Sequence, residues 1–441
     1  MLIEKIKNID SIKTAIIVDE VSISYGELLS KIEKRACFFV NQNKDFLLSN
    51  SNDLENLIDF LAIIFLGKKA VFGGKKLTII QKIALANQFD LEIVDDESNK
   101  KLLENTSIFK TKEFKSKELF LGVLTSGTTG ESKIIWKDYQ SWFSAFPHQS
   151  KIFDISENDR IFVLNSLGYS ANLNAVLHGL WLGATLVLGS LSEAKKWQEQ
   201  FEKLAVTSVF LVPSHYRLLS NTTNHSNRIN SLVSAGEKLD VKTAEKLLEI
   251  FPNSTLTEYF GAAELGHISY QQNEDIVNFP TSVGKAFPGV KIILKEGEIW
   301  VDSLYVSPSF RNCATVNDIG FFDENQNLIL LGRQGRMFNR RGLNIFAEEI
   351  ENASKSHPLV SESVAIEKKT TGIRTNILLF VKPIQNNKFS KKELHHFLLD
   401  VLPKNKLPNR IIFVEDIPKT SEGKIDFQAL NKVPSEEDSI K

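Results

Sequence analysis

The stretch "VLTSGTTGESKII", residues Val123–Ile135, places two glycines and a series of hydroxyl side chains between a short apolar run and a lysine. Gly127 and Gly130 allow the backbone to approach an anion closely, and successive backbone N–H groups can form an anion-binding concavity. Side chains supply further donors, namely Thr125, Ser126, Thr128, Thr129, Ser132 and Lys133. The stretch therefore predicts a loop that binds phosphate groups.

Two other structures are compatible with a loop of this composition. One is a surface loop rich in Ser, Thr and Gly that binds nothing. The other is the P-loop of a nucleotide triphosphatase, which needs a Lys directly after its last Gly and a Ser or Thr directly after that Lys. Here two residues separate Gly130 from Lys133, and Ile134 follows. This spacing excludes a P-loop.

The composition is that of a globular protein with two or three domains, because the 441 residues are 42% apolar and 24% charged. The 53 Lys and Arg nearly balance the 54 Asp and Glu, which argues against a general nucleic-acid-binding protein. The two cysteines, Cys37 and Cys313, are far apart in the sequence and fit no metal-ligand spacing. We therefore expect no disulfide framework, which fits a reducing compartment. The first residues lack a signal-peptide core, and the run "LAIIFLG" from Leu61 is too short to span a bilayer. We therefore expect a cytoplasmic-type protein.

Strand and helix patterns alternate along the chain. In "SYGELLSKIEKRACFFV", residues 24–40, Ser24 and Glu27 form a capping-box pattern at the start of a helix. One face of this helix carries the apolar residues Leu28, Leu29, Ile32, Ala36 and Phe39. The segment 163–189 reads as strand, loop, helix and strand. This alternation predicts an α/β architecture with a largely parallel sheet.

The pattern of expected strands and helices changes near Gly332–Gly335. Short strands with turns precede this point, and a compact α+β run of roughly one hundred residues follows it, a typical size for a small domain. We therefore predict an N-terminal domain of residues 1–333 and a C-terminal domain of residues 334–441.

The loop "TSGTTGESK" resembles the signature of the adenylate-forming superfamily, which includes acyl- and aryl-CoA synthetases, adenylation domains and luciferases. Glu131 stands where the family usually has Pro. The resemblance implies that the loop holds the β- and γ-phosphates of ATP, with Thr129 among the catalytic residues. It also implies that the N-terminal domain binds AMP and that the C-terminal domain is mobile.

The stretch "EYFGAAELG", residues 258–266, is similar to the family's aromatic-Gly-x-Thr-Glu element. The resemblance implies that Phe260, next to Gly261, stacks on adenine and that Glu264 helps to hold Mg²⁺. Both roles suit the residues, since an aromatic face takes a purine and a carboxylate takes a hard cation. Ala263 replaces the family's Thr, so a hydroxyl contact with the α-phosphate is lost or supplied elsewhere.

Two later stretches resemble the family's ribose-binding and hinge elements. By the first resemblance, "VNDIG" supplies Asp318 as acceptor for the ribose hydroxyls. By the second, in "GRQGRMFNRRGLNIFAEEIE", Arg333 contacts ribose or phosphate, and Gly342 lies where the pantetheine arm passes. The stretch also supplies Glu349, which we expect near the start of a helix, and it departs from the family at Gly335 and Asn339. Three further arginines are either a solvated face or contacts for the phosphates of CoA, namely Arg336, Arg340 and Arg341.

Near the end, "IPKTSEGKIDFQAL" resembles the element that carries the family's mobile lysine, here Lys424. The resemblance implies that Lys424 bridges the carboxylate and the α-phosphate while acyl-AMP forms. The small domain then rotates, and a thiol attacks the acyl-AMP. The implied cofactors are ATP, Mg²⁺ and either CoA or the phosphopantetheine of a carrier protein.

We expect the acid pocket in four segments, "LGYSANLN", "VPSHY", "VSAGE" and "AAELGHIS". The candidate residues in contact with the acid are Tyr169, Asn172, Ser234, Ala235 and His267, with Gly236 on the nucleotide side. His267 is either a ligand to a polar substrate or a wall residue with its own hydrogen bonds. Residues 164–175 contain no Asp, the residue with which amino-acid-activating relatives bind an ammonium group.

Three functions fit this sequence. The first is an acyl- or aryl-CoA ligase that takes a small-molecule carboxylic acid. The second is an adenylation enzyme that loads a carrier protein, although we expect no fused carrier domain. The third is a catalytically weak relative that only binds a nucleotide or an acyl-adenylate, which Ala263, Gly335 and Asn339 favour. A homodimer is compatible with each.

Overall fold

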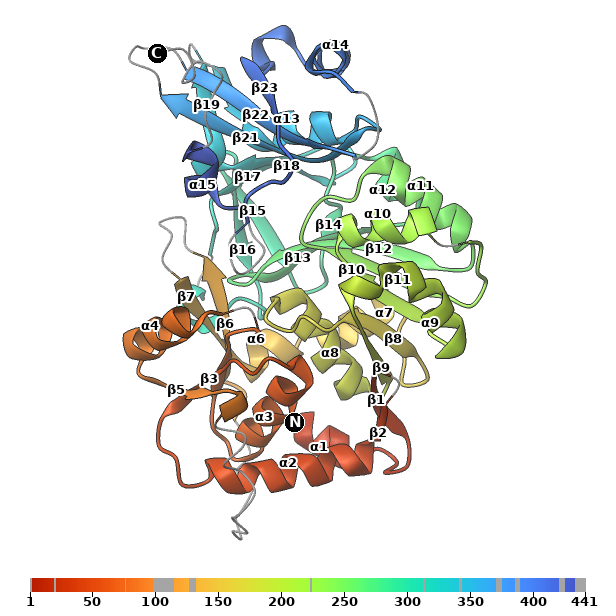
Figure 1. Cartoon of the computed structure of the whole chain (residues 1–441), viewed down its shortest axis with the longest axis vertical. Helices are drawn as coiled ribbons and strands as arrows, with labels where there is room; N and C mark the ends of the chain where they lie inside the picture. Colours follow the sequence, from red (N-terminus) through yellow and green to blue (C-terminus); the bar gives the residue numbers. More distant parts are fainter. Residues whose placement is uncertain are drawn as a thin grey trace. The chain divides into compact units, whose positions relative to one another are not determined.

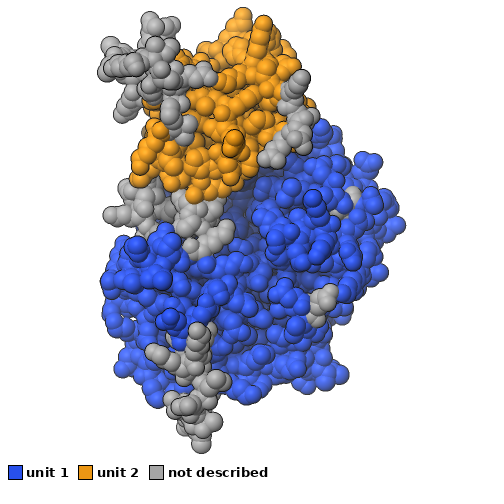
Figure 2. Space-filling model, in the orientation of Figure 1, with its two compact units in different colours: residues 1–293, 300–316, 323–328 blue, residues 294–299, 317–322, 329–441 orange. Residues whose placement is uncertain are grey.

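The computed structural model describes residues 2–19, 21–75, 77–97, 115–126, 132–222, 224–311, 314–340, 343–369, 375–384, 389–419 and 425–432. The chain divides into two compact units, which Figure 2 shows in two colours. Unit 1 comprises residues 1–293, 300–316 and 323–328, and unit 2 comprises residues 294–299, 317–322 and 329–441. The predicted boundary between residues 333 and 334 stays a prediction.

The larger sheet of unit 1 has nine strands among the described residues, in the order β14-β13-β12-β11-β10-β8-β9-β1-β2. All pairs from β12 to β1 are parallel, whereas β2, β13 and β14 join antiparallel. The strands are β1 (Thr14–Val18), β2 (Val21–Ser24), β8 (Arg160–Leu164), β9 (Thr185–Gly189), β10 (Ser208–Leu211), β11 (Ser231–Ala235), β12 (Thr255–Ala262), β13 (Gly266–Gln272) and β14 (Lys285–Ala286). The parallel strands are almost wholly buried, as expected for a sheet covered by helices.

A second sheet of unit 1 has the order β5-β3-β4-β6-β7 within the described ranges. Its strands are β3 (Asp45–Leu48), β4 (Ala70–Phe72), β5 (Leu91–Val94), β6 (Leu119–Ser126) and β7 (Ser132–Asp138). Strands β3, β4, β5 and β6 are parallel, and β7 returns antiparallel beside β6. The predicted phosphate loop therefore lies in the sequence between the paired strands β6 and β7.

The helices of unit 1 cover these sheets (Figure 1). They are α1 (Leu2–Lys7), α2 (Tyr25–Phe39), α3 (Asp53–Phe65), α4 (Ile79–Phe89), α6 (Tyr139–Phe143), α7 (Phe146–Ile152), α8 (Ser170–Leu182), α9 (Trp197–Lys203), α10 (Pro213–Thr222), α11 (Val241–Ile250), α12 (Glu274–Asn278) and the 3-10 turn η2 (Leu191–Lys196). The capping box predicted at Ser24 and Glu27 is present. Leu28, Ile32 and Phe39 of α2 are fully buried in the main core, where α2 runs beside α3.

Unit 2 contains most of the C-terminal part of the chain. A three-stranded sheet has the order β21-β22-β23, and β19 and β20 form a hairpin. The elements from residue 291 onward are β15 (Lys291–Lys295), β16 (Glu298–Asp302), η3 (Pro308–Phe310), β17 (Asp318–Phe322), β18 (Leu328–Arg333), η4 (Gln334–Arg336), β19 (Met337–Arg340), β20 (Leu343–Phe346), α13 (Ala347–Lys355), β21 (Val360–Lys369), β22 (Thr375–Pro383), α14 (Lys391–Val401), η5 (Lys404–Lys406), β23 (Arg410–Phe413) and α15 (Phe427–Lys432). β15 to β18 form a further sheet in chain order.

The predicted fold class is confirmed. Both sheets of unit 1 are mainly parallel and alternate with helices, and the C-terminal part is α+β. Glu349 lies in the first turn of α13, as expected. Among the described residues, every helix is too short or too polar to cross a lipid bilayer.

Candidate active site

The predicted phosphate loop connects two paired strands. Thr125 of β6 lies opposite Lys133 of β7, and Ser126 lies opposite Ser132 at the end of the ladder. Lys133 is exposed, so its ammonium group is available to solvent and to anions. Gly127, Thr128, Thr129 and Gly130 lie outside the described residues. The β6–β7 ladder therefore brings Thr125 and Lys133 together.

The predicted adenine and metal elements occupy the hairpin between β12 and β13. Phe260 is the partner of Ser269, and the register shifts by one residue between Phe260 and Gly261. The tip of the hairpin carries Glu264, which is partly exposed. Ser307 holds this tip, because its backbone N–H donates to the Glu264 carbonyl at 2.9 Å and its Oγ donates to the Ala263 carbonyl at 3.3 Å.

A buried lysine beside Glu264 is a candidate site residue that sequence reasoning missed. Lys137 of β7 is only 1% exposed, and its Nζ donates to the Tyr305 carbonyl at 3.3 Å. Burial lowers the pKa of Lys137 to about 7, while the carboxylates of Glu264 and Asp138 act in the opposite direction. Asp138 is itself buried and pairs with Arg311. The strand alternation gave no signal of this burial, since Lys137 shares its face of β7 with exposed Lys133 as well as with buried Ile135.

Tyr169 and Gly236 meet in the predicted acid pocket. Gly236 follows β11 with a φ of +97°, and a Cβ built on it would lie 2.2 Å from the Tyr169 hydroxyl. Desolvation, followed by the charge of Glu237, raises the pKa of Tyr169, which keeps this phenol protonated. Ser234 is fully buried, and among the described residues its Oγ has no hydrogen-bond partner. A buried hydroxyl without a partner is available to a ligand.

We predict that Gly236→Ala impairs the pocket, whereas Gly335→Ala does not impair the protein. The first change places a methyl group on the Tyr169 hydroxyl at a positive φ, and we expect a loss of about 1–3 kcal/mol in unfolding free energy. At Gly335 a Cβ would meet no described atom within 4 Å, so that variant is the matched control. Thermal denaturation of both variants checks the prediction. Equal melting temperatures would contradict it.

Two other pocket candidates, His267 and Asn172, already have hydrogen-bond or stacking partners within the protein. His267 is buried and stacks on Tyr259 with ring centroids 4.6 Å apart, and one of its nitrogens lies 2.9 Å from Gln149 Nε2. Burial lowers the pKa of His267 to about 3, so the ring is neutral. The Asn172 amide donates to the carbonyls of Leu164 and Ser166 at 3.4 and 3.2 Å. Their roles toward the acid, like that of Ala235 at the end of β11, stay predictions.

Unit 2 brings two of the predicted nucleotide residues together. Asp318 opens β17 and Arg333 closes β18, and Arg333 Nε donates to Asp318 Oδ1 at 3.0 Å. Asp318 is 3% exposed, whereas the Arg333 side chain is 56% exposed. A buried carboxylate oriented by an exposed arginine suits the recognition of sugar hydroxyls.

The suggestion that the hinge arginines form a solvated face is wrong for two of them. Arg336 pairs with Glu348 at 3.0 Å and with Glu351 at 2.5 Å, both in α13. Arg340 donates to the carbonyls of residues 405 and 407 and to the side chain of residue 409. These guanidinium groups hold the fold of unit 2. Arg341, Gly342 and Lys424 lie outside the described residues.

Comparison with known sequences decides the family. The family model described as AMP-binding enzyme matches residues 64–307, and the model described as AMP-binding enzyme C-terminal domain matches residues 349–424. The chain belongs to the AMP-binding enzyme family. This places it in the adenylate-forming superfamily, as the five motifs predicted.

Several relatives of this AMP-binding enzyme are named as CoA ligases. A putative long chain fatty acid-CoA ligase, VraA of Staphylococcus epidermidis, is 24% identical over 94% of this chain and 93% of its own length. An uncharacterised acyl-CoA ligase of Bacillus subtilis, YhfT, is 28% identical over 68% of this chain and 66% of its own length. The 2-succinylbenzoate-CoA ligase of Lactococcus lactis is 24% identical over 90% and 92%.

Solved structures support the same fold. The o-succinylbenzoate CoA synthetase of Bacillus subtilis, in complex with its acyl-adenylate intermediate, superposes with a TM-score of 0.88 at 19% identity over 98% of both chains. The amide bond synthetase McbA of Marinactinospora thermotolerans gives a TM-score of 0.83 at 16% identity over 97% of this chain and 98% of its own. At these identities the likeness establishes the fold.

The residues of the AMP-binding enzyme fit a magnesium ion that arrives with ATP. Mg²⁺ in nucleotide sites is held by one or two carboxylates together with phosphate oxygens and water, rather than by a protein cage. Glu264 is a partly exposed carboxylate at the hairpin tip, and its role toward Mg²⁺ stays a prediction. Within the described ranges, no three His, Cys, Asp or Glu side chains converge into a metal-binding cluster.

Proposed function

We propose that this AMP-binding enzyme is an AMP-forming acid–thiol ligase that converts a carboxylic acid into acyl-AMP and transfers the acyl group to CoA. One observation carries the proposal. Ala235 of β11 and Tyr259 of β12 form the last pair of this parallel ladder, so Gly236 and Phe260 follow that pair directly, at the carboxyl end of β11. Ligands of parallel α/β sheets bind at such carboxyl ends. The candidate acid pocket and the candidate adenine platform are therefore adjacent.

In the first half-reaction a carboxylate oxygen attacks the α-phosphorus of ATP, the bond to the β-phosphate bridge breaks, and pyrophosphate leaves. We assign the β- and γ-phosphates to the loop that Thr125 and Lys133 flank, the adenine to Phe260, and the ribose hydroxyls to Asp318. Mg²⁺ would lie at Glu264 and supply positive charge to the phosphate oxygens. Lys424 would bridge the carboxylate and the α-phosphate.

In the second half-reaction the CoA sulfur attacks the acyl carbonyl carbon, and AMP leaves with the bridging oxygen. We assign the passage of the pantetheine arm to the region of Gly342. CoA is favoured over a carrier protein because the relatives that align over most of this chain are named as CoA ligases. A cytoplasmic location and a homodimer remain predictions from the sequence.

We assign the acid to the pocket of Tyr169, Ser234 and Gly236. Residues 164–175 hold no carboxylate side chain that would bind an ammonium group, so an acyl or aryl acid fits better than an amino acid. The relatives' names point the same way, because they contain a long chain fatty acid and 2-succinylbenzoate.

The test is pyrophosphate release from ATP and Mg²⁺ with fatty, aryl and amino acids, each measured with and without CoA. We expect sustained turnover with one class of fatty or aryl acid, and only when CoA is present. Turnover that CoA does not change would assign the thiol to a carrier protein. The absence of turnover with every acid would leave a nucleotide-binding protein and would contradict the proposal.

A further inference from the structure

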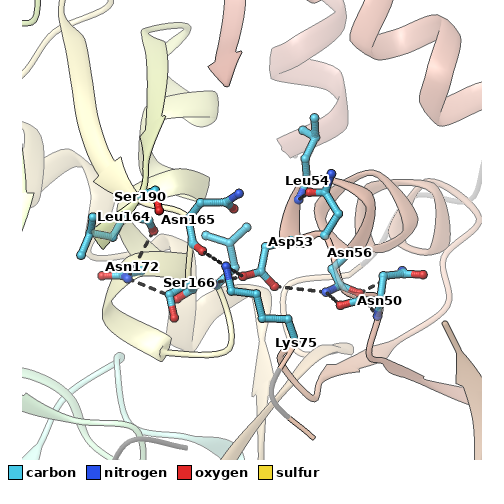
Figure 3. A network of polar contacts seen from close by, with 12 residues as sticks. Asn50, Asp53, Leu54, Asn56, Lys75, Leu164, Asn165, Ser166, Asn172 and Ser190 are labelled. Atoms are coloured by element: carbon cyan, nitrogen blue, oxygen red, sulfur yellow. Dashed lines mark hydrogen bonds and ion pairs between the residues drawn. The ribbon is translucent and has the colours of Figure 1, made fainter. Parts of the chain in front are cut away.

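The loop of residues 165–169 presents Tyr169 to the candidate acid pocket. It connects β8 to α8, and its own backbone is tightly turned, since the Ser166 N–H donates to the Leu164 carbonyl at 2.7 Å. Asn172, in the first turn of α8, braces the same turn through its amide. Figure 3 shows this loop beside residues from a distant part of the chain.

Two charged side chains, one at the start of α3 and one just after β4, form hydrogen bonds with the loop backbone. Lys75 Nζ donates to the Asn165 carbonyl at 2.6 Å, and the Leu167 N–H donates to Asp53 Oδ2 at 3.2 Å. The same Asp53 oxygen lies 3.7 Å from Lys75 Nζ, so the two charges also pair with each other. In Figure 3 Lys75 lies between Asn165 and Asp53. We call Asp53 and Lys75 the loop clamp.

A buried polar network fixes the clamp carboxylate. Asn56 Nδ2 donates to Asp53 Oδ1 at 3.1 Å, and Asn56 Oδ1 accepts both the backbone and the side-chain N–H groups of Asn50 at 2.9 Å. Asp53 is 1% exposed, and Asn50 and Asn56 are fully buried. Because a buried carboxylate needs its donors, this network specifies one position for Asp53 and thereby for the Leu167 N–H.

A second contact holds the loop from the same side. A Cβ built on Gly168 would lie 2.9 Å from the Gly74 Cα, so the two backbones touch without room for a side chain. Gly74 directly precedes Lys75, and its φ is +78°. The segment that carries Lys75 therefore contacts the loop through its own backbone as well as through the Lys75 ammonium group.

We propose that Asp53 and Lys75 are positioning residues that fix loop 165–169, and through it Tyr169, so that the loop clamp sets which acid the pocket accepts. The selectivity part of this inference rests on the proposed function, whereas the positioning part does not. The mechanism is geometric. The clamp holds the Asn165 and Leu167 backbone, and Tyr169, two residues further on, reaches Gly236 at the end of β11. A small displacement of Tyr169, which lines the candidate acid pocket, changes the fit of a substrate.

Amide hydrogen exchange of the full chain tests the positioning part. We expect exchange of peptides that cover residues 165–169 to become about tenfold faster in Asp53→Ala and in Lys75→Met. Lys75→Arg keeps the cation and should restore most of the protection. Lys69→Met is the matched control, because Lys69 is similarly exposed and pairs with Asp45 away from the loop. Unchanged exchange in both clamp variants would overturn the clamp.

Steady-state kinetics on a series of fatty and aryl acids test the selectivity part. We expect the KM for the preferred acid to rise about tenfold in Asp53→Ala and Lys75→Met and the ranking of acids to change, with the KM for ATP within about twofold of wild type. A purely structural role predicts a lower melting temperature with both KM values and the ranking unchanged, and this result would overturn the selectivity role. If the wild-type enzyme activates no acid, the proposed function and the selectivity role both fail, and the exchange experiment still decides the clamp.

Discussion

Lys424→Ala is expected to slow the formation of acyl-AMP by about a thousandfold while leaving the attack of CoA on supplied acyl-AMP within about threefold of wild type. The reason is electrostatic. In the first half-reaction the anionic carboxylate approaches the α-phosphate, whose oxygens gain negative charge as the new bond forms, and one positioned cation that bridges the two groups, the role predicted for Lys424, contributes on the order of 3–4 kcal/mol. The predicted rotation of the small domain withdraws this lysine before the thiol attacks. The measurement is single-turnover production of acyl-AMP, followed separately by thioester formation from synthetic acyl-AMP.

Lys419→Ala is a suitable control, since Lys419 lies in the same C-terminal segment and pairs with Glu362 at 2.8 Å. It should leave both half-reactions close to wild type. An equal loss of the two half-reactions in Lys424→Ala would contradict the assigned role, because a lysine that acts only during adenylation cannot slow the thiol step.

Lys137→Met is expected to make the protein more stable and the enzyme slower. Burial lowers the pKa of Lys137 to about 7, which means that the charged form is held at a cost in free energy. Replacing a strained buried charge by an apolar side chain of similar length removes that cost, and we expect a gain on the order of 1–4 kcal/mol in unfolding free energy near pH 7. Met also fills the space that the lysine stem occupies.

The pKa shift of Lys137 also fixes how the free energy of unfolding changes with pH. The pKa of Lys137 is about 7 in the folded state and has its ordinary value of 10.5 in the unfolded state. Between these values the unfolded state binds more protons, so the free energy of unfolding rises with pH in this window. Wild type should become more stable between about pH 7 and pH 10 relative to Lys137→Met, and the difference between the two should shrink. Melting temperatures across this range provide the measurement.

Although we expect Lys137→Met to be more stable than wild type, we expect its activity to be lower. The cation interacts electrostatically with the carboxylate of Glu264 and adds positive potential where we propose that the triphosphate binds, so we expect kcat/KM for ATP to fall about 10- to 100-fold. Lys151→Met, which changes an exposed lysine of the same unit, is the control. A Lys137→Met enzyme with full activity would show that this lysine is unrelated to the site.

Local patterns in the sequence predicted the local structure well. The capping box at Ser24 and Glu27 needs only residues three apart, and the structure contains it. The parallel α/β class followed from alternating strands and helices, and the motifs identified the family. These signals work because hydrogen bonds and side-chain faces repeat at fixed short spacings.

The residues that escaped prediction depend on contacts far along the chain. Lys137 is buried against Tyr305, which lies 168 positions later, and Asp53 meets Leu167 at a separation of 114. A lysine in a strand and an aspartate at a helix start both read as solvent-facing when only their neighbours are known. The same reason explains Arg336, whose partners lie on the next helix. Tertiary burial decided each case.

The most direct test of the central claim uses an acid with both carboxylate oxygens replaced by ¹⁸O. If the enzyme makes acyl-AMP, a carboxylate oxygen becomes the bridge to the α-phosphorus and stays with AMP when the thiol attacks the carbonyl. We predict that each AMP released with CoA carries one ¹⁸O by mass spectrometry. Label in orthophosphate, or AMP without label, would contradict it.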